Sequence, residues 1–422
     1  MTLLLKNTTY INYETLEFTE TDLLVEEGIS GGVRFVDDNS QTGPVDEIID
    51  CRGMFVTRAF AVGHHHAYSA LARGMPAPEK NPGNFLEILQ YIWWNLDKKL
   101  DKEMVEASAL ATALACAKAG STFVIDHHAS PNFIEGSLQV LADAFDKVGV
   151  NHLLCYEISD RDGEEKAAAG LAETAAYLES HQGLVGLHAS FTVGNKTMKK
   201  AAELIEKYHS GVHIHVAEDK MDETDSLEKY NMRVVERLNE FGFLKSSKTI
   251  LAHCLHIDDL ERRQIGESPV WVVENMESNL NNRVGLFSSK GLSDKIMLGT
   301  DGMHSDMLQS AKAAFFAGQL SDNIDYVTAY RRFRNVHRYL KENSFSGDGD
   351  NNLVVLDYDA PTGMNTGNFY GHFLFGLNAT HIRHVISNGK PIIKDRVLQT
   401  VNEQELLQFT KQQASRLWEK LK

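Results

Sequence analysis

Short apolar runs alternate with longer amphipathic stretches through most of this 422-residue chain. Between residues 60 and 320, eight such runs have the length and composition of buried strands: RAFAVGH, STFVID, NHLLCYEI, GLVGLHA, VHIHVAE, TILAHC, VWVVEN and KIMLGTD. Three of the stretches between them, residues 104–120, 134–149 and 226–242, have helical periodicity and end in glycine, a common helix cap. The alternation predicts a parallel sheet of βα units, and its extent matches the roughly 250 residues of a (β/α)₈ barrel.

The two ends of the chain have a different pattern, typical of antiparallel strands. TLLLKNTTYIN, DLLVEEG and GVRFVDD near the start, and NNLVVLDYD and HIRHVISNGKPIIKD near the end, are separated by turn residues such as Asn388–Gly389. The last stretch, EQELLQFTKQQASRLWEKLK, is amphipathic and predicts a closing helix. We therefore expect an α/β protein in which residues 58–345 form a TIM-like barrel. Residues 1–57 and 346–422, with the closing helix, are expected to form a small β-sandwich domain.

Composition excludes several classes of function. The net charge of −16 argues against a nucleic-acid or anionic-membrane partner. No apolar run reaches the length of a membrane span, and MTLLLKN is too short for the core of a signal peptide. The four cysteines are scattered without a CxxC pair, as expected of reduced thiols in a cytoplasmic protein.

Histidines and carboxylates gather where the eight predicted strands end. In a barrel of this type the chemistry lies at the carboxyl ends of the strands. In chain order these ends hold His64-His65-His66, Asp126-His127-His128, Glu157, His188, His213 and His215 with Glu218, His253 with His256, Glu274, and Asp301 with His304. Independent accidents would not keep the same register on so many strands, so the pattern predicts a metal centre at the mouth of the barrel.

The spacing of these residues narrows the ligand set. Alternate residues of a strand share a face, so His64 and His66 can point into the barrel together while His65 points away. On the fifth strand either His213 or His215 can serve, and His215 lies closer to the strand end. With Asp301 as an oxygen ligand, the set fits a catalytic zinc or ferrous site with one open position. No lysine ends the fourth strand to bridge a second metal, which favours a mononuclear site.

Four motifs together resemble one known group of enzymes. HxH on the first strand, HVAE on the fifth, AHC on the sixth and LGTDG on the eighth are similar to the amidohydrolase superfamily, in its chlorohydrolase and aminohydrolase branch with guanine and cytosine deaminases. YSALARG, WWNLD, VIDHHASPN, SDRDG, SNLNNRVG and LGTDGMHSDM further resemble the SsnA-type aminohydrolases. The resemblance covers essentially the whole chain.

The resemblance implies a role for each matching residue. One divalent metal, zinc before iron(II), is expected on His64, His66, His215 and Asp301. His253 is expected to hold the attacking water or the developing oxyanion, and Glu218 to carry a proton to the leaving group. His188 and Arg73 are expected to contact the substrate. Relatives of this kind are often dimers, so a homodimer is expected as well.

Several positions depart from the pattern of this group. Thr57-Arg58 replaces Pro-Gly before the first strand, and Ser190 replaces proline in HASFT. Glu274 stands where a histidine is usual, which hints at a cationic or N–H-rich substrate that it would bind; the alternative is a local ion pair, for example with Arg283. Trp93 and Trp94 fit core packing better than a cavity wall.

Together these features predict a metal-dependent aminohydrolase that deaminates a purine- or pyrimidine-like heterocycle. The metal lowers the pKa of its water to about 7, and Asp301 and Glu218 divide the base and acid work. A donor such as His253 at the oxyanion contributes roughly 3 kcal/mol. The first alternative is ring opening of a cyclic amide or amidine, or displacement of a substituent other than ammonia. The second is a metal-binding relative without catalytic activity.

Overall fold

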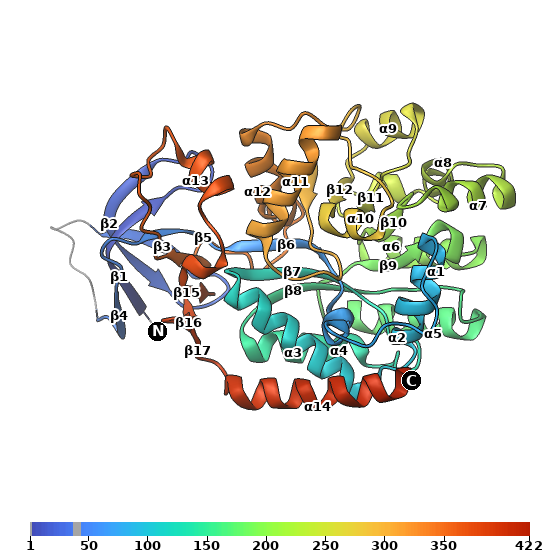
Figure 1. The fold of residues 1–422 in the computed structure, drawn as a ribbon, viewed down its shortest axis with the longest axis horizontal. Coiled ribbons are helices and arrows are strands. Elements are labelled where there is room, and N and C mark those ends of the chain that lie inside the picture. Colours follow the sequence, from blue (N-terminus) through green and yellow to red (C-terminus); the bar gives the residue numbers. More distant parts are fainter. Residues whose placement is uncertain (1, 37–43) are drawn as a thin grey trace.

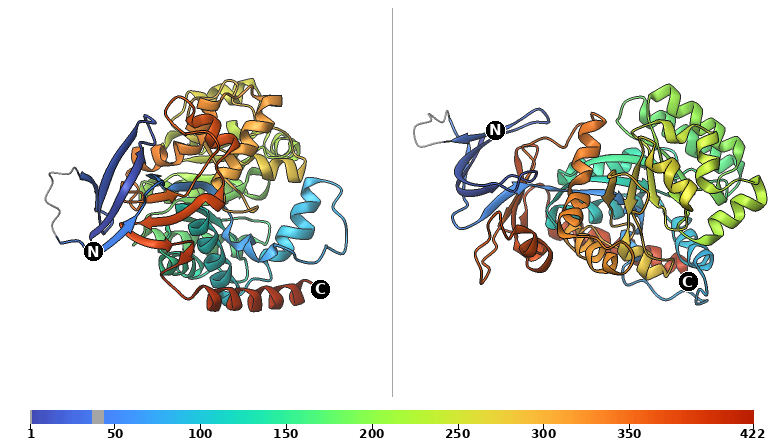
Figure 2. Two further views of the ribbon diagram at one scale, coloured as in Figure 1. Left: turned by 60° about the vertical axis from the view of Figure 1, so that its left-hand side comes forward. Right: turned by 90° about the horizontal axis from the view of Figure 1, so that it is seen from above.

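The computed structural model describes residues 2–36 and 44–422, arranged as a small β-rich part beside a larger α/β part (Figures 1 and 2). Residues 1 and 37–43, which belong to the predicted N-terminal β-segment and include the last two residues of GVRFVDD, lie outside the described residues. In the described ranges no helix is both long and apolar enough to cross a membrane.

All eight predicted strands of the α/β part are present, and neighbouring strands run parallel. They are β6 (Phe60–His65), β7 (Ser121–His128), β8 (Asn151–Tyr156), β9 (Val185–Ala189), β10 (Val212–Val216), β11 (Ile250–His253), β12 (Trp271–Glu274) and β13 (Ile296–Leu298). Their hydrogen bonds form two sheets in chain order, β6-β7-β8 and β9 to β13, rather than one continuous ring. Single parallel bridges connect the sheets at both edges, Leu154 with Gly183 and Ile158 with Leu187 on one side, and His65 with Asp301 on the other.

Helices follow the strands and cover the outside of the sheets (Figure 1). The main ones are α3 (Lys102–Lys118), α4 (Ser137–Val148), α5 (Glu164–Leu178), α6 (Asn195–Tyr208), α7 (Lys220–Tyr230), α8 (Val234–Glu240), α9 (Asp259–Gly266), α10 (Met276–Asn282), α11 (Met307–Ser321) and α12 (Tyr326–Glu342). The single helix predicted over 226–242 is wrong: Asn231 adopts a left-handed φ of 52° and ends α7, and α8 starts three residues later. The predicted glycine caps at 120, 149 and 242 all have positive φ.

The segment between β6 and α3 is helical but irregular. It contains a 3₁₀ turn (Ala67–Ala72), α1 (Phe85–Ile88), a π-helical turn (Leu89–Trp93) and α2 (Trp94–Asp97). A π turn inserts one residue into a helix and often occurs beside functional sites. Here the π turn ends with Trp93, and α2 begins with Trp94.

The β-rich part is one nine-stranded sheet made from both chain ends. Its strands are β1 (Thr2–Ile11), β2 (Phe18–Glu26), β3 (Val33–Val36), β4 (Glu47–Asp50), β5 (Phe55–Arg58), β14 (Leu353–Leu356), β15 (Ile382–Ser387), β16 (Lys390–Lys394) and β17 (Val397–Leu398). β1 pairs with β4 along its first half and with β5 along its second, so the sheet divides there. Side chains of both arms share one apolar core, which takes the place of the two separate sheets expected of a sandwich.

The closing helix α14 (Glu403–Leu421) does not pack on this sheet, although the prediction placed it in the β-domain. It lies along α3 (Figure 1). Trp418 donates its indole N–H to the carbonyl of Leu71 at 2.8 Å, and Arg416 and Lys420 both pair with Asp101. The shorter α13 (Phe369–Phe375) packs on α11 and α12.

The amino ends of the parallel strands are filled by apolar side chains. Phe123, Leu153, Trp271 and Met297 pack there with side chains of α12 such as Tyr339. This packing leaves polar residues to the carboxyl ends, where the candidate site lies.

Candidate metal centre

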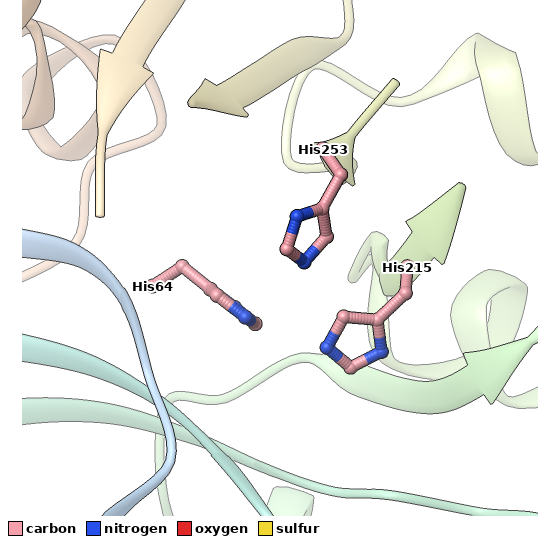
Figure 3. A group of neighbouring side chains, drawn as sticks. All are labelled: His64, His215 and His253. Carbon is pink, nitrogen blue, oxygen red and sulfur yellow. The ribbon is translucent and has the colours of Figure 1, made fainter. Parts of the chain in front are cut away.

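Three histidines from three strands point their rings at one another at the carboxyl ends of the sheets (Figure 3). His64 of β6, His215 of β10 and His253 of β11 each bring a ring nitrogen within 4.8 Å of the other two. His66 and Asp301 complete the cluster, since His64, His66 and Asp301 form a second such group. All four predicted metal ligands are therefore together, and His253 lies among them.

Hydrogen bonds behind two of the rings determine which nitrogen faces the cluster. His66 donates its Nδ1–H to the carbonyl of His127, and His215 donates its Nδ1–H to the carbonyl of His188, each at 2.7 Å. Their Nε2 atoms lie 3.1 Å apart, and both face the cluster. Such bonds are the usual support of metal-binding histidines, because they fix the tautomer and the ring orientation.

The other two rings are held from behind by side chains. His64 Nδ1 lies 2.8 Å from Nε2 of His213, and His253 Nδ1 lies 2.8 Å from Oδ1 of Asn279. His213 thus supports a candidate ligand rather than serving as one. The Nε2 atoms of His64 and His253 are buried and have no hydrogen-bond partner among the described residues. Unpartnered buried nitrogens that converge on one point are what a bound metal ion would satisfy.

The protonation of the cluster also suits a cation. Burial lowers the pKa of His64 to about 3 and that of His215 well below its usual value, so both rings are neutral, as metal ligands must be. His66 differs: although burial acts to lower it, Asp301 raises the pKa of this ring to about 9. A metal bound to His66 would therefore displace the proton that His66 shares with Asp301, whose oxygen lies 3.1 Å from His66 Nε2.

Asp301 is held in place by backbone bonds to the first strand. The amide groups of Thr300 and Asp301 both donate to the carbonyl of His64, at 3.0 and 3.1 Å. Asp301 has a φ of 52° and His253 a φ of 72°, a region that non-glycine residues rarely occupy. Strain of this kind persists where the surrounding structure enforces it, and it is common at functional sites.

Glu218 lies beside the cluster on the loop after β10. Its Oε2 is 3.6 Å from His253 Nε2, and Glu218, His253 and Asp301 form a further group of possible ligand atoms. Burial raises the pKa of Glu218 to about 7, so this carboxyl can hold a proton near neutral pH. A carboxylic acid next to a metal centre is suited to proton transfer.

A cavity with an empty volume of about 600 Å³, open solvent at its mouth included, adjoins the cluster. One wall is apolar and consists of Phe85, Leu89, Trp93 and Trp94. Both tryptophans line the cavity and also pack against the apolar core, so the two roles that the sequence analysis set against each other are combined.

The cavity is also lined by a buried network of charges. Glu157 follows β8, and its oxygens lie 3.3 Å from His127 Nδ1 and 3.5 Å from Arg161 Nη1. Arg161 also pairs with the buried Asp97, and its guanidinium lies 5.2 Å from the centre of the Trp94 ring. Both Glu157 and Arg161 line the cavity.

The predicted substrate contact His188 lines the same cavity. Its Nδ1 lies 2.7 Å from the hydroxyl of Thr192, in the turn after β9. Arg237, which is 1% exposed, fastens this turn by donating to the carbonyls of Ser190 and Val193 and to the side chain of Asn195. The Ser190 hydroxyl also accepts from Arg237 at 2.8 Å, so the departure from proline here has a partner.

Arg73 and Glu274, the other predicted substrate contacts, do not line this cavity. Arg73 is exposed on a neighbouring hollow, 3.4 Å from the carbonyl of Met303. Glu274 is buried and accepts a hydrogen bond from Arg332 of α12 at 2.8 Å. The ion pair considered as its alternative role is present, with Arg332 in place of Arg283.

His65, the middle residue of the triplet His64-His65-His66, turns away from the cluster, as the alternation of side chains along a strand predicts. His65 contacts Asp126 and Ser305 instead. His304 likewise pairs with Glu277 and does not face the cluster. No sequence pattern pointed to Asn279, because its contact with His253 depends on how α10 packs.

An α/β chain that gathers imidazoles and carboxylates at the carboxyl ends of parallel strands, with an acid beside them, has the fold and site of a metal-dependent hydrolase. The model of the Amidohydrolase family matches residues 59–334, and the chain belongs to this family. The family resemblance read from the HxH, HVAE, AHC and LGTDG motifs is thereby confirmed.

Named relatives and solved structures are similar over nearly the whole chain. A 5-methylthioadenosine/S-adenosylhomocysteine deaminase of Thermococcus sibiricus is 25% identical over 93% of this chain and 94% of its own. A 5′-deoxyadenosine deaminase of Methanococcus vannielii is 26% identical over 93% and 95%. The crystal structure of an adenosine deaminase from Xanthomonas campestris with bound zinc has a TM-score of 0.84 at 19% identity, covering 98% of both chains. Guanine deaminase of E. coli has a TM-score of 0.77 at 16% identity, covering 93% and 99%.

Proposed function

We propose that this protein is a metal-dependent aminohydrolase that removes an exocyclic amino group, as ammonia, from a purine- or pyrimidine-like heterocycle. The observation that carries the proposal is the meeting of a metal-ligand cluster, an acid and an oriented histidine at one small-molecule cavity. The relatives named above, both deaminases of amino-heterocycles, support the same reaction.

The donors that converge in this cavity fit one divalent metal ion. His64, His66 and His215 supply nitrogens and Asp301 a carboxylate oxygen, a donor set typical of catalytic zinc, with iron(II) as the second choice. When bound, the metal supplies hydroxide at neutral pH and polarises the carbon that is attacked. Zinc is also the metal bound in the similar adenosine deaminase structure.

The side chains around the metal ligands divide the remaining work. Asp301 accepts the proton released when water is activated, and Glu218, with its pKa raised to about 7, delivers a proton to the departing amino group. His253 donates its Nδ1–H to Asn279, so it needs a second proton on Nε2 to donate a hydrogen bond to the negative charge that develops on the attacked carbon's oxygen. His188 contacts the heterocycle from the cavity wall.

The same proposal extends to the architecture and the compartment. The two parallel sheets, bridged at both edges, act as one (β/α)₈ barrel, and the β-rich part is its accessory domain. All four cysteines are buried free thiols, which supports a cytoplasmic location. A homodimer stays a prediction.

Metal analysis combined with ammonia release tests the proposal. About one zinc or iron per chain is expected, with ammonia from at least one compound in a panel of aminated purines, pyrimidines and their nucleosides. Glu218→Gln should lower the rate of ammonia release by about 10²–10⁴-fold while leaving the metal content unchanged, and Asp301→Ala should lose both the activity and the metal. The matched control is Glu277→Gln, because this carboxylate pairs with His304 and does not line the cavity. Metal without ammonia from any compound would refute deamination and point to ring opening or another leaving group.

A further inference from the structure

Glu157 is a buried carboxylate at the cavity wall whose capacity to accept hydrogen bonds is not used up. Its side chain is 2% exposed, yet it lines the cavity. Its contacts with His127 and Arg161, at 3.3 and 3.5 Å, are longer than most hydrogen bonds. An ionised carboxylate offers about four acceptor positions, so at least two of them remain for a ligand.

The surrounding charges keep this carboxylate ionised. Although burial acts to raise it, His188, His127 and Arg161 hold the pKa of Glu157 well below its usual range. Arg161 is in turn fixed by Asp97 and lies over the ring of Trp94. Glu157 is therefore an acceptor and never a donor at neutral pH, and only an N–H, an O–H or a cation can satisfy it.

Glu157 also lies close to the reaction centre. Single ligand atoms of Glu157, His188 and His215 are all within 4.8 Å of one another, and His215 belongs to the metal cluster as well. A flat ring whose amino-bearing carbon lies at the cluster is thus placed with another of its edges against Glu157. The ring itself, rather than a substituent that reaches toward the cavity mouth, is what this carboxylate meets.

We propose, on the basis of the function proposed above, that Glu157 determines specificity by accepting a hydrogen bond from a ring N–H of the substrate, and that the substrate is a free base. Cytosine, isocytosine and guanine all present ring N–H donors. The base of an adenosine-type nucleoside presents only acceptor nitrogens besides its amino group, because the sugar replaces the N–H. Facing these acceptors, Glu157 would remain buried and unpartnered, which costs binding free energy.

The proposal departs from the printed names of the two curated relatives, which are deaminases of nucleosides and related compounds. Those chains are 25% and 26% identical to this one, so the residues that face their substrates need not be shared. The ribose hydroxyls of a nucleoside are also donors. A preference for nucleosides is therefore the result that would overturn the inference.

The first test compares free bases with their nucleosides in the metal-loaded, full-length enzyme. Ammonia release is measured for cytosine against cytidine and for adenine against 5′-deoxyadenosine, because in both pairs the sugar replaces the ring N–H. We expect kcat/KM for at least one free base with a ring N–H to exceed that of its nucleoside by tenfold or more. Ammonia from nucleosides at equal or higher kcat/KM refutes the inference and leaves the proposed function standing. No ammonia from any compound refutes the proposed function itself.

The second test replaces the carboxylate by its amide. Glu157→Gln should lower kcat/KM for the preferred base roughly 10–100-fold, the value of one hydrogen bond to a charged group, while metal content and melting temperature stay close to wild type. Glu277→Gln is the control. The dissociation constant of the base, measured by calorimetry in the Glu218→Gln background without turnover, should rise by a similar factor on adding Glu157→Gln. An effect of Glu157→Gln no larger than that of the control would overturn the inference. If the amide variant does not fold, Glu157→Asp and the base-to-nucleoside comparison still decide.

Discussion

Arg237 holds the turn that carries the Thr192 partner of His188. The free energy of unfolding lost on replacing Arg237 can be worked out from its contacts. Its guanidinium makes five hydrogen bonds to the segment 190–195 and lies 3.6 Å from the centre of the Tyr230 ring. Arg237→Leu leaves the buried carbonyls of Ser190 and Val193 and the Ser190 hydroxyl without their donor, at about 1–3 kcal/mol for each acceptor. Relief from burying a cation offsets part of this cost, so we expect a loss of about 4 kcal/mol in the free energy of unfolding.

Urea unfolding followed by tryptophan fluorescence measures this loss, and hydrogen exchange locates it. Arg237→Lys keeps the charge but lacks the planar fork, so it should lose about half as much. Amide protection should fall first in residues 190–195, the turn that carries the Thr192 partner of His188. A leucine variant within 1 kcal/mol of wild type, or exchange that increases uniformly along the chain, would show that the fork does not hold this turn.

Four further predictions concern the site and its surroundings. Glu218 has a pKa of about 7 and acts in its protonated form, so ammonia release should fall as the pH rises through 7. Glu218→Gln should lower kcat by about 10²–10⁴-fold and remove this limb of the pH–rate profile. Asn279→Leu removes the acceptor that orients His253 and should lower kcat about 10–100-fold with little change in KM; a larger change in KM than in kcat would contradict the assigned role. Although burial acts to raise it, His337 and its neighbours lower the pKa of Asp348 to about 2. The group therefore contributes about 2 kcal/mol to the free energy of unfolding. This contribution is fully present above the unfolded pKa of 3.8 and is lost as the pH falls through 2. Asp348→Asn should therefore lower the urea midpoint at pH 7 but not at pH 2. Removing the metal with a chelator should lower the melting temperature, and adding zinc back should restore it.

The strands and the metal cluster could be predicted from the sequence because they obey local rules. A buried strand shows as an apolar run, and alternation on it separates His64 and His66 from His65. The carboxyl ends of parallel strands meet at one edge, so residues there converge whatever the details of packing. His64, His66, His215 and Asp301 therefore met as expected.

Contacts made by the covering helices could not be predicted in this way. Glu274 ends a strand, as the ligands do, but its side chain forms an ion pair with Arg332 of α12 and does not face the cavity. Asn279 and Trp94 reach the site because of how α10 and the π turn lie, and neither depends on a strand period. The YSALARG motif predicted Arg73 as a substrate contact, but Arg73 lines a neighbouring hollow.

The bridge between His65 and Asp301 has a consequence for how the enzyme matures on the ribosome. It joins the first and the last strand of the α/β part, so the two halves of the ligand set belong to segments synthesised far apart in time. A nascent chain that has emerged only as far as β12 has the three histidine ligands, His64, His66 and His215. It lacks Asp301 and the amide groups that hold Asp301 to the carbonyl of His64. The complete ligand set therefore arises only when β6 and the segment after β13 come together. Contacts between segments so far apart in the sequence form slowly. A bound metal would therefore stabilise the complete chain and not a chain that ends before β13.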